Sequence, residues 1–205
     1  MIVNNRQLVV LKPERIQEGI SFGIKRHKAK DKSFRNKDIH RFKNKTRTKI
    51  AKKLGLGEQF IAHIEGVWGE EIYSEFSGQP IDTTIYAVRD DGEDFRGVEV
   101  KMNLFGGEDL MLRITKTEYK QRKKPLVYVL THILLDEILT KDFSKESING
   151  YIIGAITAED FDQKKTTWNG GRNLPDNWVV KEIAEGLWTD DIKQAWAAKQ
   201  AESTP

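Results

Sequence analysis

Apolar and polar residues alternate along this chain in patterns that predict one helix followed by two strands. Between residues 58 and 76, apolar side chains recur every three or four positions, the spacing of an amphipathic helix, and "SGQP" at 77–80 ends it. The segments "IDTTIYAVR" at 81–89 and "FRGVEVKM" at 95–102 alternate with a period of two, which predicts strands. "DDGED" lies between them and is typical of a turn.

The next segments complete an α/β order. The apolar run "PLVYVLTHILL" at 125–135 predicts a strand that is covered on both faces, and the polar segment 115–124 is compatible with a helix. Shorter strands are expected at 110–114 and 148–157. Residues 58–135 therefore have the order α-β-β-β-α-β, which predicts an α/β fold with a central mixed sheet flanked by helices.

Positive charge is concentrated in one segment. Residues 24–53 contain fourteen Lys and Arg against two Asp, a formal charge of +12, whereas the rest of the chain carries −9. Such a block stays extended unless an anion compensates it, so we expect contacts with nucleic-acid phosphate; a solvated basic helix is the alternative. We divide the chain into a basic N-terminal arm or subdomain at 1–55, with a strand at 6–12, and a core at 56–205 that ends in a helix at 189–200.

Composition excludes several classes of site. The chain has no cysteine, which excludes disulfides, thiolate catalysis and zinc sites built on cysteine. The four histidines have no metal-ligand spacing, so histidine ligation of a metal is not predicted. No apolar run approaches the ~20 residues that span a bilayer. We therefore expect an intracellular, cytoplasmic protein that does not contact a membrane.

The strand at 95–102 carries charge on one of its two faces. Successive residues point to opposite faces, so Val98 and Val100 face one way and Glu99 and Lys101 the other. The valines supply the hydrophobic face, which predicts that the charged pair lies on the polar side of the sheet. A half-exposed edge hairpin has the same alternation, so the pattern alone leaves a purely structural role open.

An aspartate is expected beside this charged pair, in one of two ways. A tight turn at 96–97 would place Asp94 opposite Glu99, whereas a turn farther upstream would instead pair Asp82 with Lys101. Either arrangement gathers two carboxylates and an ammonium group, and carboxylates at that range repel each other unless a cation neutralises them. Two carboxylates and a backbone carbonyl suit Mg²⁺ or Mn²⁺, and metal-bound water can attack a phosphodiester.

The Asp…Glu-x-Lys pattern in an α-β-β-β-α-β core resembles the PD-(D/E)xK nuclease superfamily. "DFRGVEVK" is similar to the hairpin of the mismatch-repair nicking endonucleases and of many phage-encoded members, and "GVWGEEIYSEFSG" is similar to the helix that supplies another acidic residue. The resemblance covers about residues 58–157. It implies a restriction-endonuclease-like fold, a Mg²⁺- or Mn²⁺-dependent DNA endonuclease activity and a possible homodimer.

The same resemblance implies roles for the residues of the hairpin. Glu99 would be a metal ligand, the Val100 carbonyl another, and Lys101 the catalytic lysine. "GEDFRGVEVK" favours Asp94 as the metal-binding aspartate. Asp82, in a Pro-x-Asp segment that opens a strand, resembles the restriction-enzyme arrangement and remains the alternative.

The acidic residue of the helix has three candidates. The Gly-Glu opening of the family's helix implies Glu70. A helical wheel instead puts Glu70 away from the apolar face and Glu71 and Glu75 within it, and a carboxylate on the buried side needs a partner. An ordinary exposed acidic turn is the alternative for all three residues.

Basic residues of two segments are candidates for contacts with DNA phosphate. They are Lys25, Arg26, Lys28, Arg41, Lys43, Lys45, Arg47, Lys120 and Arg122. A second hypothesis is a non-catalytic nucleic-acid-binding protein that uses residues 24–53, in which the hairpin charges form only a surface salt bridge.

Overall fold

A four-stranded mixed sheet lies at the centre of the structure, a computed structural model that describes residues 6–29, 45–85, 93–104, 110–121, 124–168 and 177–180. The strand order is β1-β5-β4-β2, formed by Gln7–Leu11, Ile148–Thr157, Val127–Ile133 and Val98–Asn103. Strands β1 and β4 run antiparallel to β5, whereas β2 runs parallel to β4. The strands expected in these four segments are confirmed.

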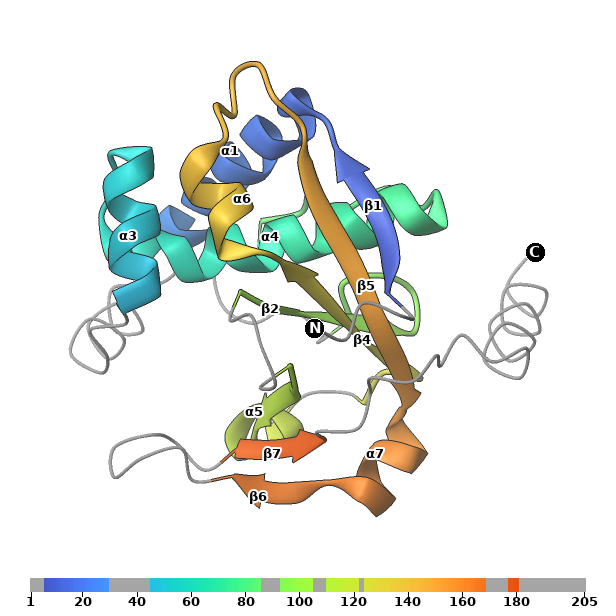
Figure 1. Cartoon of the computed structure of the whole chain (residues 1–205). Coiled ribbons are helices and arrows are strands. Elements are labelled where there is room, and N and C mark those ends of the chain that lie inside the picture. Colours follow the sequence, from blue (N-terminus) through green and yellow to red (C-terminus); the bar gives the residue numbers. More distant parts are fainter. Residues whose placement is uncertain are drawn as a thin grey trace.

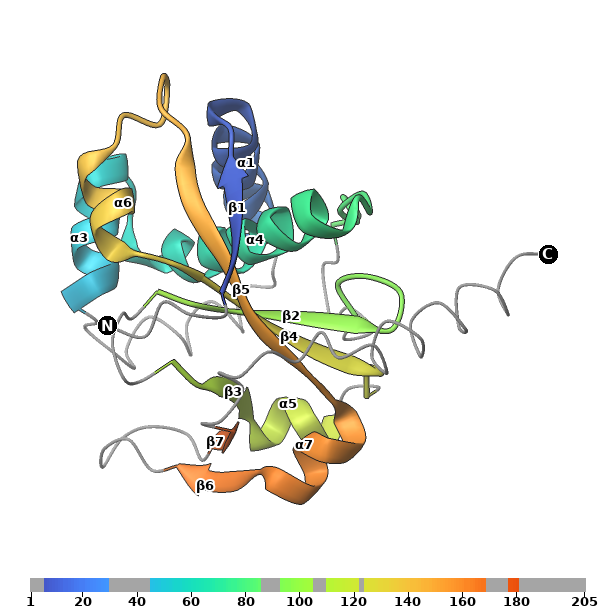
Figure 2. The same ribbon diagram turned by 45° about the vertical axis from the view of Figure 1, so that its right-hand side comes forward.

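Among the described residues, one side of this sheet is covered by four helices, as Figures 1 and 2 show: α1 (Pro13–Ala29), α3 (Lys45–Leu54), α4 (Glu58–Ser77) and α6 (Leu135–Thr140). Helix α4 contacts all four strands, and it buries Trp68 and Ile72 completely. It ends at Gly78, whose φ of 72° is left-handed and whose N–H donates to the Ser74 carbonyl. The helix that the apolar spacing predicts at 58–76 is therefore confirmed.

Two glycines allow α1 to pack very close to α4. A Cβ atom at Gly23 would lie 2.7 Å from the Cα of Ile64, and one at Gly19 would lie 2.7 Å from the Trp68 ring. Trp68 Nε1 donates a hydrogen bond to the Ile16 carbonyl at 3.2 Å, so the two helices are also joined by a buried polar contact. This packing brings side chains of α1 within reach of α4 over most of its length.

The opposite face of the sheet is covered by a second, smaller layer (Figure 2). This layer contains β3 (Leu112–Thr115), β7 (Asn177–Val180) and β6 (Thr166–Trp168), with α5 (Lys116–Gln121) and α7 (Ala158–Lys164). Leu112 and Phe161 of this layer are fully buried in one cluster with Tyr128 and Leu130 of β4. All seven residues of β4 are buried, which confirms a strand covered on both faces.

The N-terminal elements pack with the rest of the described chain. β1 pairs with β5 in the central sheet, and Ile16 of α1 is fully buried in the main core. The sequence patterns did not predict α1, because its buried positions are one isoleucine and two glycines. The proposed boundary between 1–55 and 56–205 remains a prediction.

Several expected elements have a different outcome. The strand expected at 81–89 is absent from residues 81–85, which are neither helix nor strand, and 86–89 lie outside the described residues. The helix expected at 189–200 also lies outside them. In the part of the chain that the structure describes, no helix has both the length and the apolar character needed to cross a membrane.

Candidate active site

A tight turn immediately before β2 places Asp94 beside that strand. Phe95 and Val98 exchange two backbone hydrogen bonds, of 3.0 Å and 2.8 Å. Gly97, with φ of 75°, occupies the turn position that favours glycine because an L side chain is strained there. The turn predicted at 96–97 is therefore confirmed, and its register puts Asp94 across from Glu99.

Asp94 is bound by the main chain of β2. Its Oδ2 accepts a hydrogen bond from the backbone N–H of Val100 at 2.8 Å, on the last strand in the sheet order. Burial and, to a smaller extent, the negative charge of Glu70 raise the pKa of Asp94 to about 7, against the opposing effects of Lys101, the Val100 N–H and Arg26. Asp94 is therefore within electrostatic reach of both Glu70 and Lys101.

Glu99 and Lys101 form a close ion pair, with Lys101 Nζ 2.5 Å from Glu99 Oε1. Glu99 is 3% exposed, and it lies in register with Tyr128, which belongs to the second hydrophobic cluster. Burial raises the pKa of Tyr128, and the charges of Tyr119 and Glu99 add to this effect. The prediction that the pair lies on a polar side of the sheet is wrong, because the second layer covers that face.

Val100 and Met102 point to the other face, as expected. A Cβ atom at Gly69 of α4 would lie 3.0 Å from the Met102 Cβ and 3.6 Å from the Val100 Cγ1. Alternate residues of β2 therefore contact α4 on one side and the second layer on the other. The Val100 side chain packs in the core, which leaves only its main chain for a role in the site.

Glu70 of α4 is buried and is bound by Arg26 of α1. The Arg26 guanidinium donates to both carboxylate oxygens, at 2.5 Å from Nη1 to Oε1 and 2.9 Å from Nη2 to Oε2. The helical wheel is wrong about Glu70, because residues 67–74 are all buried between α1 and the sheet. Of the three carboxylates considered on this helix, Glu70 is the one whose charge acts on Asp94.

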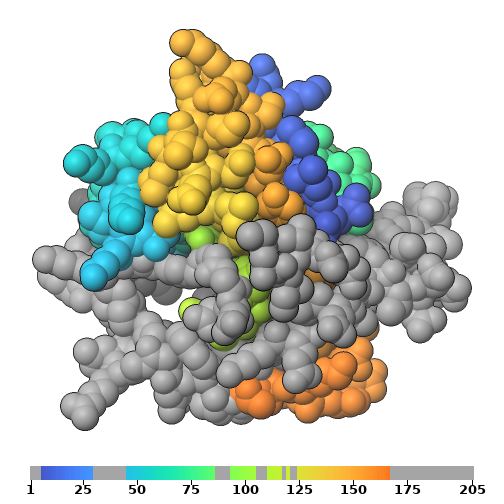
Figure 3. All heavy atoms as spheres, in the orientation of Figure 1, coloured from blue at the N-terminus to red at the C-terminus, as the bar shows by residue number. Residues whose placement is uncertain are grey.

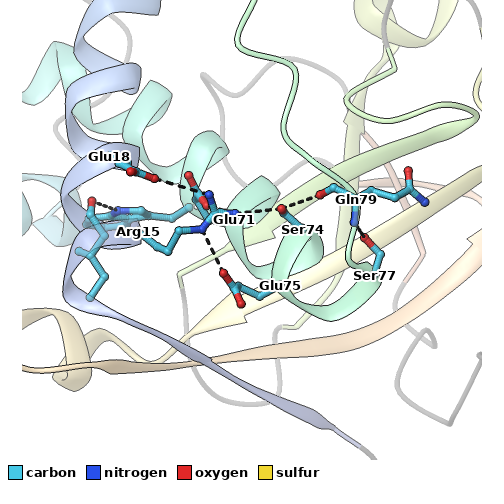
Figure 4. Close-up of polar contacts among 9 residues, drawn as sticks. Arg15, Glu18, Glu71, Ser74, Glu75, Ser77 and Gln79 are labelled. Carbon is cyan, nitrogen blue, oxygen red and sulfur yellow. Dashed lines mark hydrogen bonds and ion pairs between the residues drawn. The ribbon is translucent and has the colours of Figure 1, made fainter.

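Glu71 and Glu75 belong to a different contact, between α4 and Arg15 of α1 (Figure 4). Arg15 lies 2.8 Å from Glu71 Oε2 and 3.1 Å from Glu75 Oε1, and it also donates to Ser74 Oγ at 2.9 Å. Glu18 of α1 approaches the same guanidinium at 3.5 Å. These carboxylates therefore bind α1 to α4 through Arg15.

Burial raises the pKa of Glu71 to about 7, despite the lowering effect of Arg15, from an ordinary value of 4.5. The folded protein therefore keeps the Glu71 proton to higher pH than the unfolded chain does. The protonated carboxyl favours the folded state, and this contribution to the free energy of unfolding is lost as pH rises from the unfolded pKa through about 7. We expect Glu71→Gln to gain stability relative to the wild type between pH 5 and pH 8, by about 1–3 kcal/mol. Urea unfolding of the variant and the wild type at pH 5 and at pH 8 measures this difference in stability. Glu75→Gln, at the exposed edge of the same contact, is the control, and an equal gain in both variants would contradict the assignment.

Asp82 is placed differently from Asp94. Its carboxylate is exposed and accepts a hydrogen bond from the Thr84 N–H at 2.8 Å. Its backbone carbonyl accepts a hydrogen bond from Arg26 at 3.3 Å. The upstream turn at 91–92 that would pair Asp82 with Lys101 lies outside the described residues.

The basic residues expected to contact DNA fall into three groups. Lys25 and Lys28 on α1, Lys45 at the start of α3 and Lys120 on α5 are exposed. Arg26 and Arg47 each bind a carboxylate; Arg47 binds Glu65, with Nη2 2.7 Å from Oε2. The remaining three, Arg41, Lys43 and Arg122, lie outside the described residues. Figure 3 shows α3 beside α6 on one face of the molecule.

Comparisons with known proteins identify no relative. No protein-family model, no curated protein and no solved structure matches the chain. A function must therefore be inferred from the hairpin at 93–101 and the side chains around it.

Oxygen atoms are the only metal donors that the hairpin offers. Across the described residues, no three or more side chains of His, Cys, Asp or Glu are grouped closely enough to hold a metal ion. The set expected from the sequence is smaller, namely the carboxylates of Asp94 and Glu99 and the carbonyl of Val100. Its hard oxygen donors fit Mg²⁺ or Mn²⁺, which take few protein ligands and retain several waters.

The sequence reasoning missed the two arginines of α1 that bind α4. Arg15, Gly19, Gly23 and Arg26 follow one another at intervals of four, four and three residues, so they lie on one face of the helix. That spacing was the available signal, and it was hidden because Arg26 lies inside the basic segment. In the structure this face packs against α4.

Proposed function

We propose that this protein is a Mg²⁺-dependent DNA endonuclease that hydrolyses phosphodiester bonds at the Asp94, Glu99 and Lys101 hairpin. The observation that supports this most strongly is the hairpin itself. In this hairpin the Asp94 carboxylate accepts a hydrogen bond from the Val100 N–H, and Asp94 lies across from Glu99, which forms an ion pair with Lys101. Two carboxylates and an amine in partly buried surroundings are groups that metal-assisted phosphodiester hydrolysis can use, and the negative charge of Glu70 on α4 acts on one of them.

The proposal assigns the metal to three groups. The carboxylates of Asp94 and Glu99 and the carbonyl of Val100 would hold Mg²⁺ or Mn²⁺. A bound divalent cation supplies Lewis-acid chemistry: it lowers the pKa of a water and neutralises charge on the phosphate. The raised pKa of Asp94 is consistent with such a role, because a buried carboxylate with a neighbouring carboxylate has a deficit of positive charge.

Lys101 supplies a positive charge at the same place. Its side chain is 21% exposed, and Glu99 holds its amine at 2.5 Å. From this position the ammonium group can donate hydrogen bonds to a phosphate oxygen or to the attacking water. The Glu99 carboxylate thus has two functions in the proposal, since it orients Lys101 and contributes to the metal site.

The arrangement of elements supports the finer fold assignment, a restriction-endonuclease-like core. Helix α4 precedes the hairpin, and the chain from β2 to β4 passes through β3 and α5 before returning parallel to β2. The described elements from α4 to β4 thus match the expected order, except for the strand at 81–89. The four-stranded sheet is flanked by α1, α3, α4 and α6 on one side only, with a second sheet on the other.

Cleavage of supercoiled plasmid with and without Mg²⁺ tests the proposal. We expect Lys101→Met to lower the cleavage rate by about 10²–10³-fold, because the variant retains the aliphatic stem but loses the charge at the phosphate. Lys141→Met is the matched control, since Lys141 pairs with Glu146 at 3.5 Å on the segment after α6. Cleavage that persists in chelator, or full activity in Lys101→Met, would contradict the proposal.

A non-catalytic nucleic-acid-binding protein is the second candidate, and the exposed lysines favour it. Lys25, Lys28 and Lys45 present charge to solvent from the basic segment, independently of the hairpin. In this case the protein should bind DNA in a salt-sensitive manner without cutting it. The Glu99–Lys101 pair would then be structural, although its burial differs from the surface salt bridge that this hypothesis expected.

A further inference from the structure

Arg26 is held at three points around its guanidinium group. Both oxygens of Glu70 accept from it, and the backbone carbonyl of Asp82 accepts from Nη2 at 3.3 Å. The ring of Phe22, one helical turn earlier on α1, lies 4.5 Å from the guanidinium carbon. This single side chain therefore connects α1, α4 and the segment that follows α4.

The geometry of this contact determines how the Glu70 carboxylate is oriented. A guanidinium fork that binds both oxygens fixes the plane of the carboxylate as well as its position, which an ammonium group cannot do. Glu70 is buried on α4, and the same helix contacts the hairpin through Tyr73, whose ring centroid lies 4.7 Å from that of Phe95, the residue after Asp94. The negative charge of Glu70 also raises the pKa of Asp94. Arg26 thus controls both the direction and the effective charge of a carboxylate beside the candidate site.

We infer that Arg26 is a positioning residue of this site, which acts through Glu70 and sets how strongly the hairpin attracts a divalent cation. The inference rests on the proposed function and assigns Arg26 a different role from the DNA contact expected from its place in the basic segment. In this inference Asp82 contributes through its backbone carbonyl, which accepts a hydrogen bond from Arg26, and its carboxylate has no role.

Removing Arg26 has two opposite consequences. At a pH where Glu70 stays ionised, its charge would no longer be compensated, so the negative field at Asp94 and Glu99 would become stronger and a cation would bind more tightly. The Glu70 carboxylate would at the same time lose its fixed orientation, so turnover would fall even when the site is saturated with metal. A residue that merely stabilises the fold would not separate these two effects.

The test measures Mn²⁺ affinity by calorimetry for the wild type, Arg26→Ala, Glu70→Gln and the double variant. We expect Arg26→Ala to tighten Mn²⁺ binding about 5- to 10-fold, because a neighbouring positive charge is removed. In the Glu70→Gln background the same substitution should have a clearly smaller effect on affinity, since only the direct effect of the Arg26 charge on Asp94 then remains. Equal effects of Arg26→Ala in both backgrounds would overturn the inference.

Arg15→Ala is the matched control, because Arg15 also joins α1 to carboxylates of α4 but at Glu71 and Glu75. It should lower thermal stability and leave Mn²⁺ affinity unchanged. Arg26→Lys, which retains charge without the fork, covers the case in which Arg26→Ala does not fold. We expect it to have nearly the wild-type Mn²⁺ affinity and a cleavage rate about 10- to 100-fold lower.

The outcomes separate this inference from the proposed function. A wild type that binds Mn²⁺ and cleaves DNA, with additive Arg26 and Glu70 effects on Mn²⁺ affinity, removes only the inference and leaves the proposed function standing. A wild type that binds no Mn²⁺ removes both. Equal shifts in Mn²⁺ affinity in Arg15→Ala and Arg26→Ala would also overturn the positioning role of Arg26.

Discussion

Asp94→Asn is expected to lower Mg²⁺-dependent cleavage by about 10³-fold or more, and Asp82→Asn by less than about threefold. Both aspartates are candidates in the sequence pattern, which favours Asp94, and they differ in their surroundings. Asp94 accepts a hydrogen bond from the Val100 N–H, and the charges of Glu70 and Lys101 act on it, whereas the Asp82 carboxylate is exposed and accepts a hydrogen bond from the Thr84 N–H. In the proposed function, only Asp94 shares a cation with Glu99.

Asparagine is the sharpest replacement at position 94 because it separates charge from folding. Its amide oxygen can still accept the hydrogen bond from Val100, so the hairpin should remain in place. The pKa of Asp94 is raised to about 7, so its ionised form is disfavoured in the folded protein, and removing the charge should not reduce stability at pH 8. A loss of cleavage therefore reports on chemistry.

The measurement is the rate of plasmid nicking and linearisation at equal concentrations of folded protein. Thermal unfolding of each variant at pH 8 checks that the comparison is between folded proteins. An inactive Asp82→Asn together with an active Asp94→Asn would move the metal ligand to Asp82 and would overturn the site described here.

Gly97→Val is expected to have the largest effect on stability, a decrease of about 2–4 kcal/mol in the free energy of unfolding. A β-branched residue is strained at the φ of 75° that the turn requires. Its Cβ would also lie 2.9 Å from Leu126 Cδ1, and the Leu126 side chain can relieve only part of that clash. The Gly97 carbonyl accepts from the N–H groups of Leu126 and Val127, so a displaced turn would weaken the start of β4 as well.

Gly78→Val is the control for backbone strain alone. Gly78 has φ of 72°, and nothing lies within 4 Å of the position of a Cβ atom there. We expect that variant to lose only about 1–2 kcal/mol and to retain cleavage per folded molecule. Urea unfolding measures both variants, and equal losses would mean that the contact with Leu126 relaxes without cost.

Gly97→Val should also impair cleavage in the fraction that remains folded. The turn sets the register in which Asp94 lies across from Glu99, and a shift of about 1 Å in a catalytic group can cost 10²-fold in rate. Cleavage at a temperature well below the unfolding midpoint separates this effect from the loss of stability.

The parts of the fold that depend on local pattern could be predicted from the sequence. The apolar spacing of α4, the alternation of β2 and the apolar run of β4 each reflect burial that repeats along one element. Helix α1 was missed because close packing against α4 replaces apolar side chains with Gly19 and Gly23, which carry no periodic hydrophobic signal. The strand expected at 81–89 is absent from its described part, residues 81–85, because alternation of β-branched residues does not by itself supply a pairing partner.

By itself the sequence determined the two faces of β2 and the presence of two acidic groups and an amine within eight residues, and it offered the turn at 96–97 as one of two alternatives. These features depend on neighbours along the chain. The tertiary structure decided that Glu70 binds Arg26 while Glu71 and Glu75 bind Arg15, and that a second layer buries Glu99. Those outcomes depend on where α1 crosses α4 and on what covers the sheet, so they join residues far apart in sequence that no local pattern relates.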